Sequence, residues 1–121
     1  MILGVGLDLQ DVERIERAIS KPHFLERIYS EEERAQIAKK GAQTAAGYFA
    51  AKEAVAKALG TGFSGFCMWD ISVRCDELGK PEAVLQRGAL ERMQALGASA
   101  VVLSITHSGG FAAAVAILSN D

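Results

Sequence analysis

The sequence predicts an α+β protein in which an antiparallel sheet packs against a long central helix. Three observations predict this fold class. Residues 47–62 are small or apolar on two opposite helical faces, which is typical of a buried helix. Residues 1–9 and 100–105 place apolar side chains at alternate positions, as strands do. Between residues 100–105 and the next strand-forming segment stands Ser108-Gly109-Gly110, a hairpin turn, so these strands are expected to be antiparallel.

The bulk composition limits the classes of function. With 121 residues, half of them hydrophobic, the chain is predicted to form one domain over residues 1–121. The net charge of −2 argues against general nucleic-acid binding, and no apolar run approaches the ~20 residues that a membrane span needs. Cys67 and Cys75 fit no metal-binding spacing and suggest free thiols in a cytoplasmic protein. A domain this small has a high surface-to-volume ratio, so oligomerisation would stabilise it.

The first strand is predicted over residues 1–9. One of its faces is wholly apolar, and we expect it in the core: Leu3, Val5, Leu7 and Leu9. The opposite face carries Gly4, Gly6 and Asp8, and the two glycines leave open space beside the Asp8 carboxylate. Because glycine in a strand often marks a close approach by a ligand or another backbone, Asp8 can face a ligand. Alternatively, Asp8 caps a turn at the end of the strand.

A short helix is predicted to follow, with Asp11 as its N-cap and Pro22 at its end. Apolar residues recur on one side at helical spacing: Val12, Ile15 and Ile19. The opposite side is basic and carries Arg14, Arg17 and, just beyond, Lys21. Such a face is either simply solvated or a docking surface for an acidic partner protein.

Residues 23–29 are predicted to be a connector with Phe24, Leu25 and Ile28 turned inward. Ser30-Glu31-Glu32-Glu33 is a capping box that starts a second helix, which Gly41 ends after Lys40.

The central helix is predicted to begin near Gln43 and to end in Gly60-Thr61-Gly62, whose backbone amides can meet an oxygen-rich ligand. One face carries Phe49, Glu53, Lys57 and Gly60. Charges on a buried helix persist only when they are paired or bound. Glu53 and Lys57 are four residues apart and can pair with each other, or they can bind a ligand together.

The second half of the chain is predicted to hold a loop over 63–69, a strand over 70–75, a turn over 76–81 and a hairpin partner over 82–86. A surface helix around Ala89 to Leu96 is closed by Gly97. The final hairpin joins strand 100–105 to strand 111–118, and His107 continues the face of Val101, Leu103 and Ile105. His107 is either a hydrogen-bonded histidine at a strand end or, beside Thr106, a phosphate or adenine contact.

No segment is a standard metal, nucleophile or phosphate-loop signature. Two carboxylates, Asp8 and Glu53, can nevertheless hold one hard cation, and Mg²⁺ needs few protein carboxylates because water and phosphates complete its coordination. Lys57, one turn from Glu53, can neutralise charge on a phosphate. The residues alone therefore indicate phosphoryl or substituted-phosphoryl transfer from a nucleotide-like donor.

Several segments together resemble the holo-acyl-carrier-protein synthases, within the phosphopantetheinyl transferases. They occur in the family's order and spacing over nearly the whole chain. The matching segments are Gly4-Val5-Gly6-Leu7-Asp8-Leu9, Phe49-Ala50-Ala51-Lys52-Glu53-Ala54 with Lys57-Ala58, Gly60-Thr61-Gly62, Asp70-Ile71, Asp76 with Gly79-Lys80-Pro81, and Ser104-Ile105-Thr106-His107. Each segment alone is weak, and together they are specific.

The resemblance implies the family's fold, a homotrimer with the cleft between neighbouring subunits, and a Mg²⁺-dependent reaction. Phosphopantetheine would move from coenzyme A to a serine of apo-acyl carrier protein, for fatty acid biosynthesis. Asp8 and Glu53 would bind Mg²⁺, Glu53 would help to remove the serine proton, and Lys57 would steady the leaving phosphate. Coenzyme A contacts are expected from Lys40, Phe49, Lys57, Gly60, Thr61, Gly62, Lys80, Pro81, Thr106 and His107. The carrier protein is expected at Arg14, Arg17 and Lys21.

One position departs from the family pattern. Tyr48 stands where the family usually has a phosphate-contacting arginine, and tyrosine cannot replace that charge, although Lys40 nearby can compensate. A non-catalytic trimeric module that binds a nucleotide or carrier protein therefore remains an alternative. A third possibility is a domain that works inside a larger synthase assembly.

Overall fold

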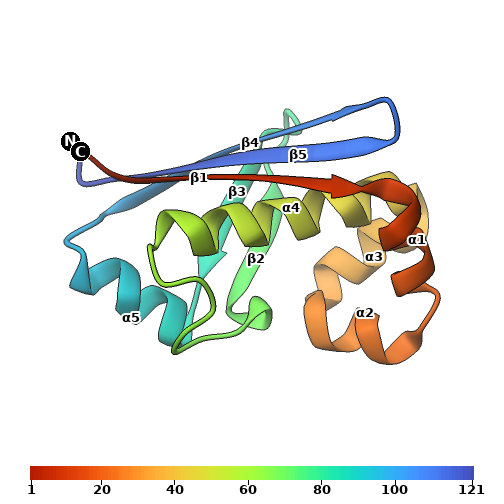
Figure 1. Cartoon of the computed structure of the whole chain (residues 1–121), viewed down its shortest axis with the longest axis horizontal. Helices are drawn as coiled ribbons and strands as arrows, with labels where there is room; N and C mark the ends of the chain where they lie inside the picture. Colours follow the sequence, from red (N-terminus) through yellow and green to blue (C-terminus); the bar gives the residue numbers. More distant parts are fainter.

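The computed structural model describes residues 1–121, and its helices and strands are those shown in Figure 1. In chain order they are β1 (Ile2–Asp11), α1 (Val12–Ile19), α2 (Pro22–Ile28), α3 (Glu31–Lys40), α4 (Ala42–Ala58), the 3₁₀ turn η1 (Met68–Asp70), β2 (Ile71–Cys75), β3 (Pro81–Leu85), α5 (Arg87–Ala95), β4 (Ala100–Ser108) and β5 (Phe111–Ser119). None of the helices combines the length and the apolar character needed to cross a membrane.

An antiparallel sheet lies along the long helix α4, as the sequence predicts. The sheet has the strand order β1-β5-β4, and β2 and β3 form a separate antiparallel pair. Figure 1 shows α4 running beneath β1 and β5, with α1, α2 and α3 gathered at one end and α5 at the other. One cluster of 23 buried residues joins these elements, and eleven residues of α4 are buried. The α+β class and the buried central helix are thus confirmed.

Small residues allow β1 and α4 to touch backbone to backbone. A Cβ atom on Gly4 would overlap the carbonyl oxygen of Ala58, and one on Gly6 would overlap that of Ala54. On the same face of the sheet, β5 contributes Ala112, Ala114 and Ala116, all buried. The glycines of β1 therefore mark a close backbone approach. This approach places Asp8, the next residue on the same face of the strand, beside the helix.

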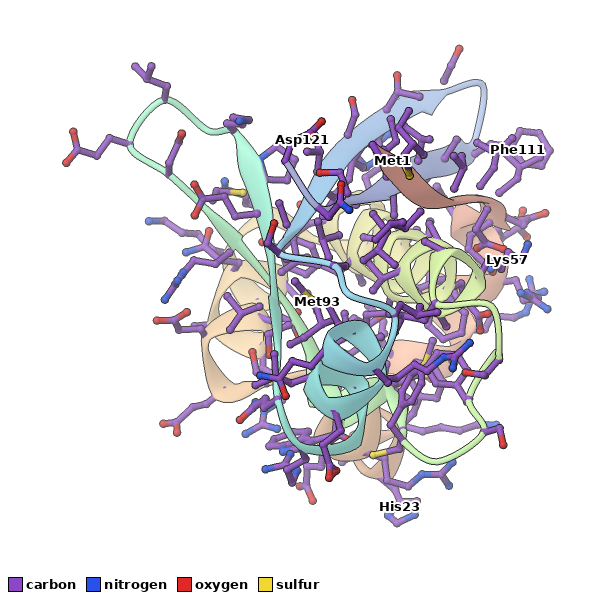
Figure 2. The ribbon with its side chains drawn as sticks, turned by 90° about the vertical axis from the view of Figure 1, so that its left-hand side faces the viewer. Met1, His23, Lys57, Met93, Phe111 and Asp121 are labelled. Atoms are coloured by element: carbon purple, nitrogen blue, oxygen red, sulfur yellow. The ribbon has the colours of Figure 1, made fainter.

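The predicted core face of β1 is wrong for three of its four residues in the single chain, whereas Leu3 is partly buried against the core. Val5, Leu7 and Leu9 are 57%, 66% and 62% exposed, because the sheet packs on α4 through its glycine and alanine face instead. Val102 of β4 and Phe111 of β5 belong to the same outer face by strand register and are about half exposed. Figure 2 shows Phe111 projecting away from the body of the molecule. The outer face of β1 and β5 is therefore largely apolar, whereas β4 adds Ser104 and Thr106 to this face.

The predicted connector over residues 23–29 is also wrong, since Pro22–Ile28 forms helix α2. Pro22 begins this helix instead of only ending the previous one, because the first helical position needs no backbone N–H and suits the fixed φ of proline. Phe24, Leu25 and Ile28 do turn inward, as predicted. The remaining start signals are confirmed: Asp11 accepts a hydrogen bond from the Arg14 amide at 3.2 Å, and Ser30 forms its capping box.

A buried ion pair, which the sequence analysis missed, connects three elements. Lys52 Nζ of α4 lies 2.9 Å from Glu33 Oε1 of α3, and both side chains are fully buried. Glu33 Oε2 accepts a hydrogen bond from the Val73 amide of β2 at 2.6 Å, and Lys52 also donates to the Ile71 carbonyl of β2. Burial lowers the pKa of Lys52, and the charge of Glu33 opposes that shift. This pair fixes the middle of α4 against α3 and β2.

Candidate active site

The structure places six of the predicted site residues in two groups on α4 and its neighbours. The first, the carboxylate cluster, is Asp8, Glu53 and Lys57. The second, the His107 groove, is lined by Lys40, Tyr48, Cys75, Gly79, Pro81 and His107.

In the carboxylate cluster, Lys57 pairs with Asp8. Lys57 Nζ lies 3.3 Å from Asp8 Oδ1 and donates to the Leu7 carbonyl at 2.9 Å. The alternative pairing of Lys57 with Glu53 is not formed, because the close approach of β1 puts Asp8 within reach of the lysine. Asp8 is largely buried, with 11% of its side chain exposed, and an open hollow of about 510 Å³ lies beside Asp8 and Lys57. Asp8 is thus not merely a turn cap.

Glu53 carries an unfavourable negative charge when no cation is bound. Its pKa is raised first by burial and then by the charge of Asp8, while Lys57 and Arg14 act in the opposite direction. Two carboxylates close enough to repel each other form a site that a cation would stabilise. No group of three or more His, Cys, Asp or Glu side chains that could hold a metal occurs in the structure. The carboxylates of Asp8 and Glu53 are hard oxygen donors of the kind that Mg²⁺ takes, and Mg²⁺ keeps water and phosphate ligands of its own.

Gln10 and Arg14 extend the cluster, and the sequence analysis did not single out Gln10. Gln10 Nε2 donates to Asp8 Oδ2 at 2.6 Å, and Arg14 Nη2 donates to Gln10 Oε1, also at 2.6 Å. Asp11 caps α1 through the Arg14 amide, so the guanidinium turns back toward β1. The alternation of β1 places Gln10 on the same face as Asp8, and this pattern could have identified it.

The His107 groove has a volume of about 170 Å³. His107 Nε2 lies 2.9 Å from the Gln43 carbonyl, so His107 is hydrogen-bonded at the strand end and also lines the groove. A Cβ atom on Gly47 would come within 2.9 Å of the same nitrogen, so glycine leaves the room that His107 needs. A neighbouring hollow of about 580 Å³ shares four lining residues with the groove: Lys40, Tyr48, Cys75 and Gly79.

Tyr48 presents a neutral hydroxyl to the groove at neutral pH. Burial, followed by nearby Cys75 and Glu33, raises the pKa of Tyr48 to about 12. The side chain can therefore donate a hydrogen bond but supplies no charge, and Lys40 is the cation that shares this groove.

The other predicted residues lie outside these two groups. Gly60 and Gly62, both at positive φ, follow the end of α4, where Arg92 Nε donates to the Leu59 carbonyl at 3.0 Å. Phe49 stacks on Phe24 with ring centroids 6.1 Å apart. The remaining predicted residues are exposed: Thr61, Lys80, Thr106, Arg17 and Lys21. Of these, Arg17 pairs with Glu13 at 3.4 Å.

One chain does not bring the two groups together. His107 contacts α4 at Gln43 and Gly47, whereas the carboxylate cluster uses Glu53 and Lys57. At 1.5 Å per residue, Gly47 and Lys57 are separated by about 15 Å along the helix axis. A ligand that touched both groups would have to extend over at least this length or bridge two chains.

Comparisons with known proteins agree with one another. The sequence model of the 4′-phosphopantetheinyl transferase superfamily matches residues 4–116. A holo-[acyl-carrier-protein] synthase of Caldanaerobacter subterraneus subsp. tengcongensis is 45% identical over 97% of this chain and 94% of its own length. The Helicobacter pylori holo-[acyl-carrier-protein] synthase in complex with coenzyme A superposes with a TM-score of 0.85 at 33% identity, over 95% of this chain and 99% of that one. A Bacillus anthracis holo-(acyl-carrier-protein) synthase in complex with CoA (3′,5′-ADP) superposes with a TM-score of 0.83 at 38% identity, over 100% of this chain and 99% of that one.

Proposed function

The chain belongs to the 4′-phosphopantetheinyl transferase superfamily, within its holo-[acyl-carrier-protein] synthases, and we propose that the carboxylate cluster carries its chemistry. The reaction transfers the 4′-phosphopantetheine group of coenzyme A to a serine of apo-acyl carrier protein and releases adenosine 3′,5′-bisphosphate, a step in fatty acid biosynthesis. The observation that carries the proposal is the convergence of Asp8, Glu53 and Lys57, with an open hollow beside Asp8 and Lys57.

Each residue of the cluster has a proposed role. Asp8 and Glu53 hold Mg²⁺, which when bound would neutralise the pyrophosphate of coenzyme A. Glu53 accepts the proton of the serine hydroxyl as its oxygen attacks the phosphorus of the phosphopantetheine group. Lys57 exchanges its contact with Asp8 for the departing phosphate and stabilises the negative charge that collects there.

The His107 groove is proposed to hold the adenosine end of coenzyme A. Lys40 and His107 line it, Lys40 supplies a donor for a phosphate, and Pro81 offers an apolar surface for the base. Tyr48 contributes a neutral hydroxyl where a cation is typical of the family. Further contacts are proposed from Phe49, Gly60, Thr61, Gly62, Lys80 and Thr106.

We propose that the chain assembles as a homotrimer. The outer face of the sheet exposes Val5, Leu7 and Leu9, and large apolar surfaces of this kind mark interfaces. Because the carboxylate cluster and the His107 groove lie apart on one α4, a neighbouring chain would complete the site. We also propose that residues 1–121 form one domain and that the protein is cytoplasmic.

Replacing Val5 by aspartate is expected to convert a trimer into monomers, because a charge at this position would be desolvated inside the interface. Size-exclusion chromatography with light scattering measures the change directly. The matched control is Gln94→Asp, which adds the same charge to the exposed side of α5 and is expected to leave the mass unchanged. A wild-type chain that elutes with the mass of one copy would contradict the assembly.

The docking surface for the carrier protein is proposed to be the basic side of α1. Arg14, Arg17 and Lys21 are exposed there, and complementary charge on an acidic carrier would raise the encounter rate.

Intact mass spectrometry of an apo-acyl carrier protein tests the function. Incubation with the purified chain, coenzyme A and Mg²⁺ is expected to add the mass of one 4′-phosphopantetheine group, and removal of the metal by EDTA is expected to abolish the addition. Tight binding of coenzyme A with no mass change under any divalent metal would show a binding module instead of a transferase.

A further inference from the structure

Gln10 is a buried side chain that the proposed reaction does not use, and it stands between two residues that the reaction does use. Only 6% of Gln10 is exposed. Its Nε2 donates to Asp8 Oδ2 and its Oε1 accepts from Arg14 Nη2, each at 2.6 Å. One amide thus connects a proposed metal ligand on β1 to a proposed docking residue on α1.

The two partners determine which way the amide points. The carboxylate of Asp8 requires the NH₂ end, and the guanidinium of Arg14 requires the carbonyl end. Reversing the amide would place its oxygen against the carboxylate of Asp8 and its NH₂ group against the guanidinium of Arg14, so neither hydrogen bond could form. Because hydrogen bonds in a buried chain polarise one another, the charge of Arg14 strengthens the bond from Gln10 to Asp8.

Asp8 depends on such hydrogen bonds for its orientation. Its neighbour on the same face of β1 is Gly6, and its partner across the sheet is Ala114, so packing alone provides little to restrain the carboxylate. Gln10 engages Oδ2, while Oδ1 faces Lys57. The bond from Gln10 therefore selects which oxygen is presented toward the hollow.

We propose that Gln10 is a positioning residue for Asp8, and that Arg14 acts on the metal site through Gln10. This Arg14–Gln10–Asp8 relay rests on the proposed function, since it takes Asp8 as a Mg²⁺ ligand. Residues that hold a metal ligand in place are typically worth ~10–100-fold in metal affinity. Arg14 then has a role in the site even when no carrier protein is present.

Through-space electrostatics predicts the opposite sign for Arg14. Its positive charge acts on Glu53, so it also repels a cation at the same site. If Arg14 acted only through its charge, removing that charge would tighten metal binding. If the relay operates, removing Arg14 loosens Gln10 and weakens metal binding. The sign of the change therefore separates the two explanations.

The test measures Mn²⁺ binding by the whole purified chain, in the absence of coenzyme A and carrier protein. Electron paramagnetic resonance reports free Mn²⁺, so the readout does not depend on activity. Gln10→Met and Arg14→Met are each expected to weaken binding about 10-fold. The double variant should be no weaker than Gln10→Met, because both changes break the same relay. Arg27→Met, which removes an exposed cation from α2, is the matched control and should bind like the wild type.

Tighter or unchanged binding by Arg14→Met would overturn the relay, as would losses that simply add in the double variant. If Gln10→Met does not fold, the side-chain amide signals of Gln10 in the wild-type NMR spectrum provide the second measurement. They are expected to shift when Mg²⁺ is added, and an absence of any shift would overturn the proposal. A wild-type chain that binds no Mn²⁺ would instead remove Asp8 and Glu53 as ligands, and the relay with them.

Discussion

Glu53→Gln is expected to reduce phosphopantetheine transfer by about 10³-fold, because glutamine can neither accept the serine proton nor bind Mg²⁺ as an anion. The shape of the side chain is preserved, and the proposed coenzyme A contacts lie mainly in the His107 groove, so coenzyme A should still bind. Initial rates from the mass-shift assay, together with calorimetric titration of coenzyme A, measure the two effects separately. Wild-type rates in this variant would show that Glu53 is not the base.

Stability offers an independent check on the same variant. Burial and then the charge of Asp8 raise the pKa of Glu53, so its ionised form is less stable in the folded chain than in the unfolded chain. Removing that charge should leave the metal-free protein at least as stable as the wild type. The control is Glu91→Gln on the exposed side of α5, which should change neither activity nor stability. A marked loss of stability in Glu53→Gln would mean that the rate loss reports misfolding.

Lys52→Met is expected to produce the largest loss of stability, about 3–5 kcal/mol, because it leaves the buried carboxylate of Glu33 without its counter-charge. Methionine fills a similar volume, so the loss would arise from charge and not from a cavity. Urea unfolding at a fixed chain concentration measures it, since the stability of an oligomer depends on concentration.

Two further variants identify the cause. Adding Glu33→Gln to Lys52→Met removes the uncompensated charge, so the double variant is expected to be more stable than Lys52→Met alone. Arg17→Met breaks the exposed pair with Glu13 and should cost less than ~1 kcal/mol. Equal losses for the buried and the exposed pair would show that burial of the charges is not the reason.

Features that depend on neighbours in the chain were predictable. The N-cap at Asp11, the capping box at Ser30 and the end of α3 at Gly41 rest on local hydrogen bonds and on a positive φ, and all three occur as predicted. The strands were predictable from alternation, and Asp8 and Glu53 were found by their setting among small residues and by the family resemblance. Such patterns involve only residues a few positions apart, which a single sequence displays directly.

Features that depend on which surfaces meet were decided by tertiary structure alone. Alternation separates the two faces of β1 but does not predict which face packs against α4. The glycine face packs there because only this face permits backbone contact. The partners Glu33 and Lys52, on separate helices, have no local pattern that joins them. Gln10 acquires its place between Asp8 and Arg14 only when β1 turns into α1. The sequence by itself determined most of the elements and the candidate site residues, whereas tertiary packing determined their partners, because contact energies act between atoms that the fold brings together.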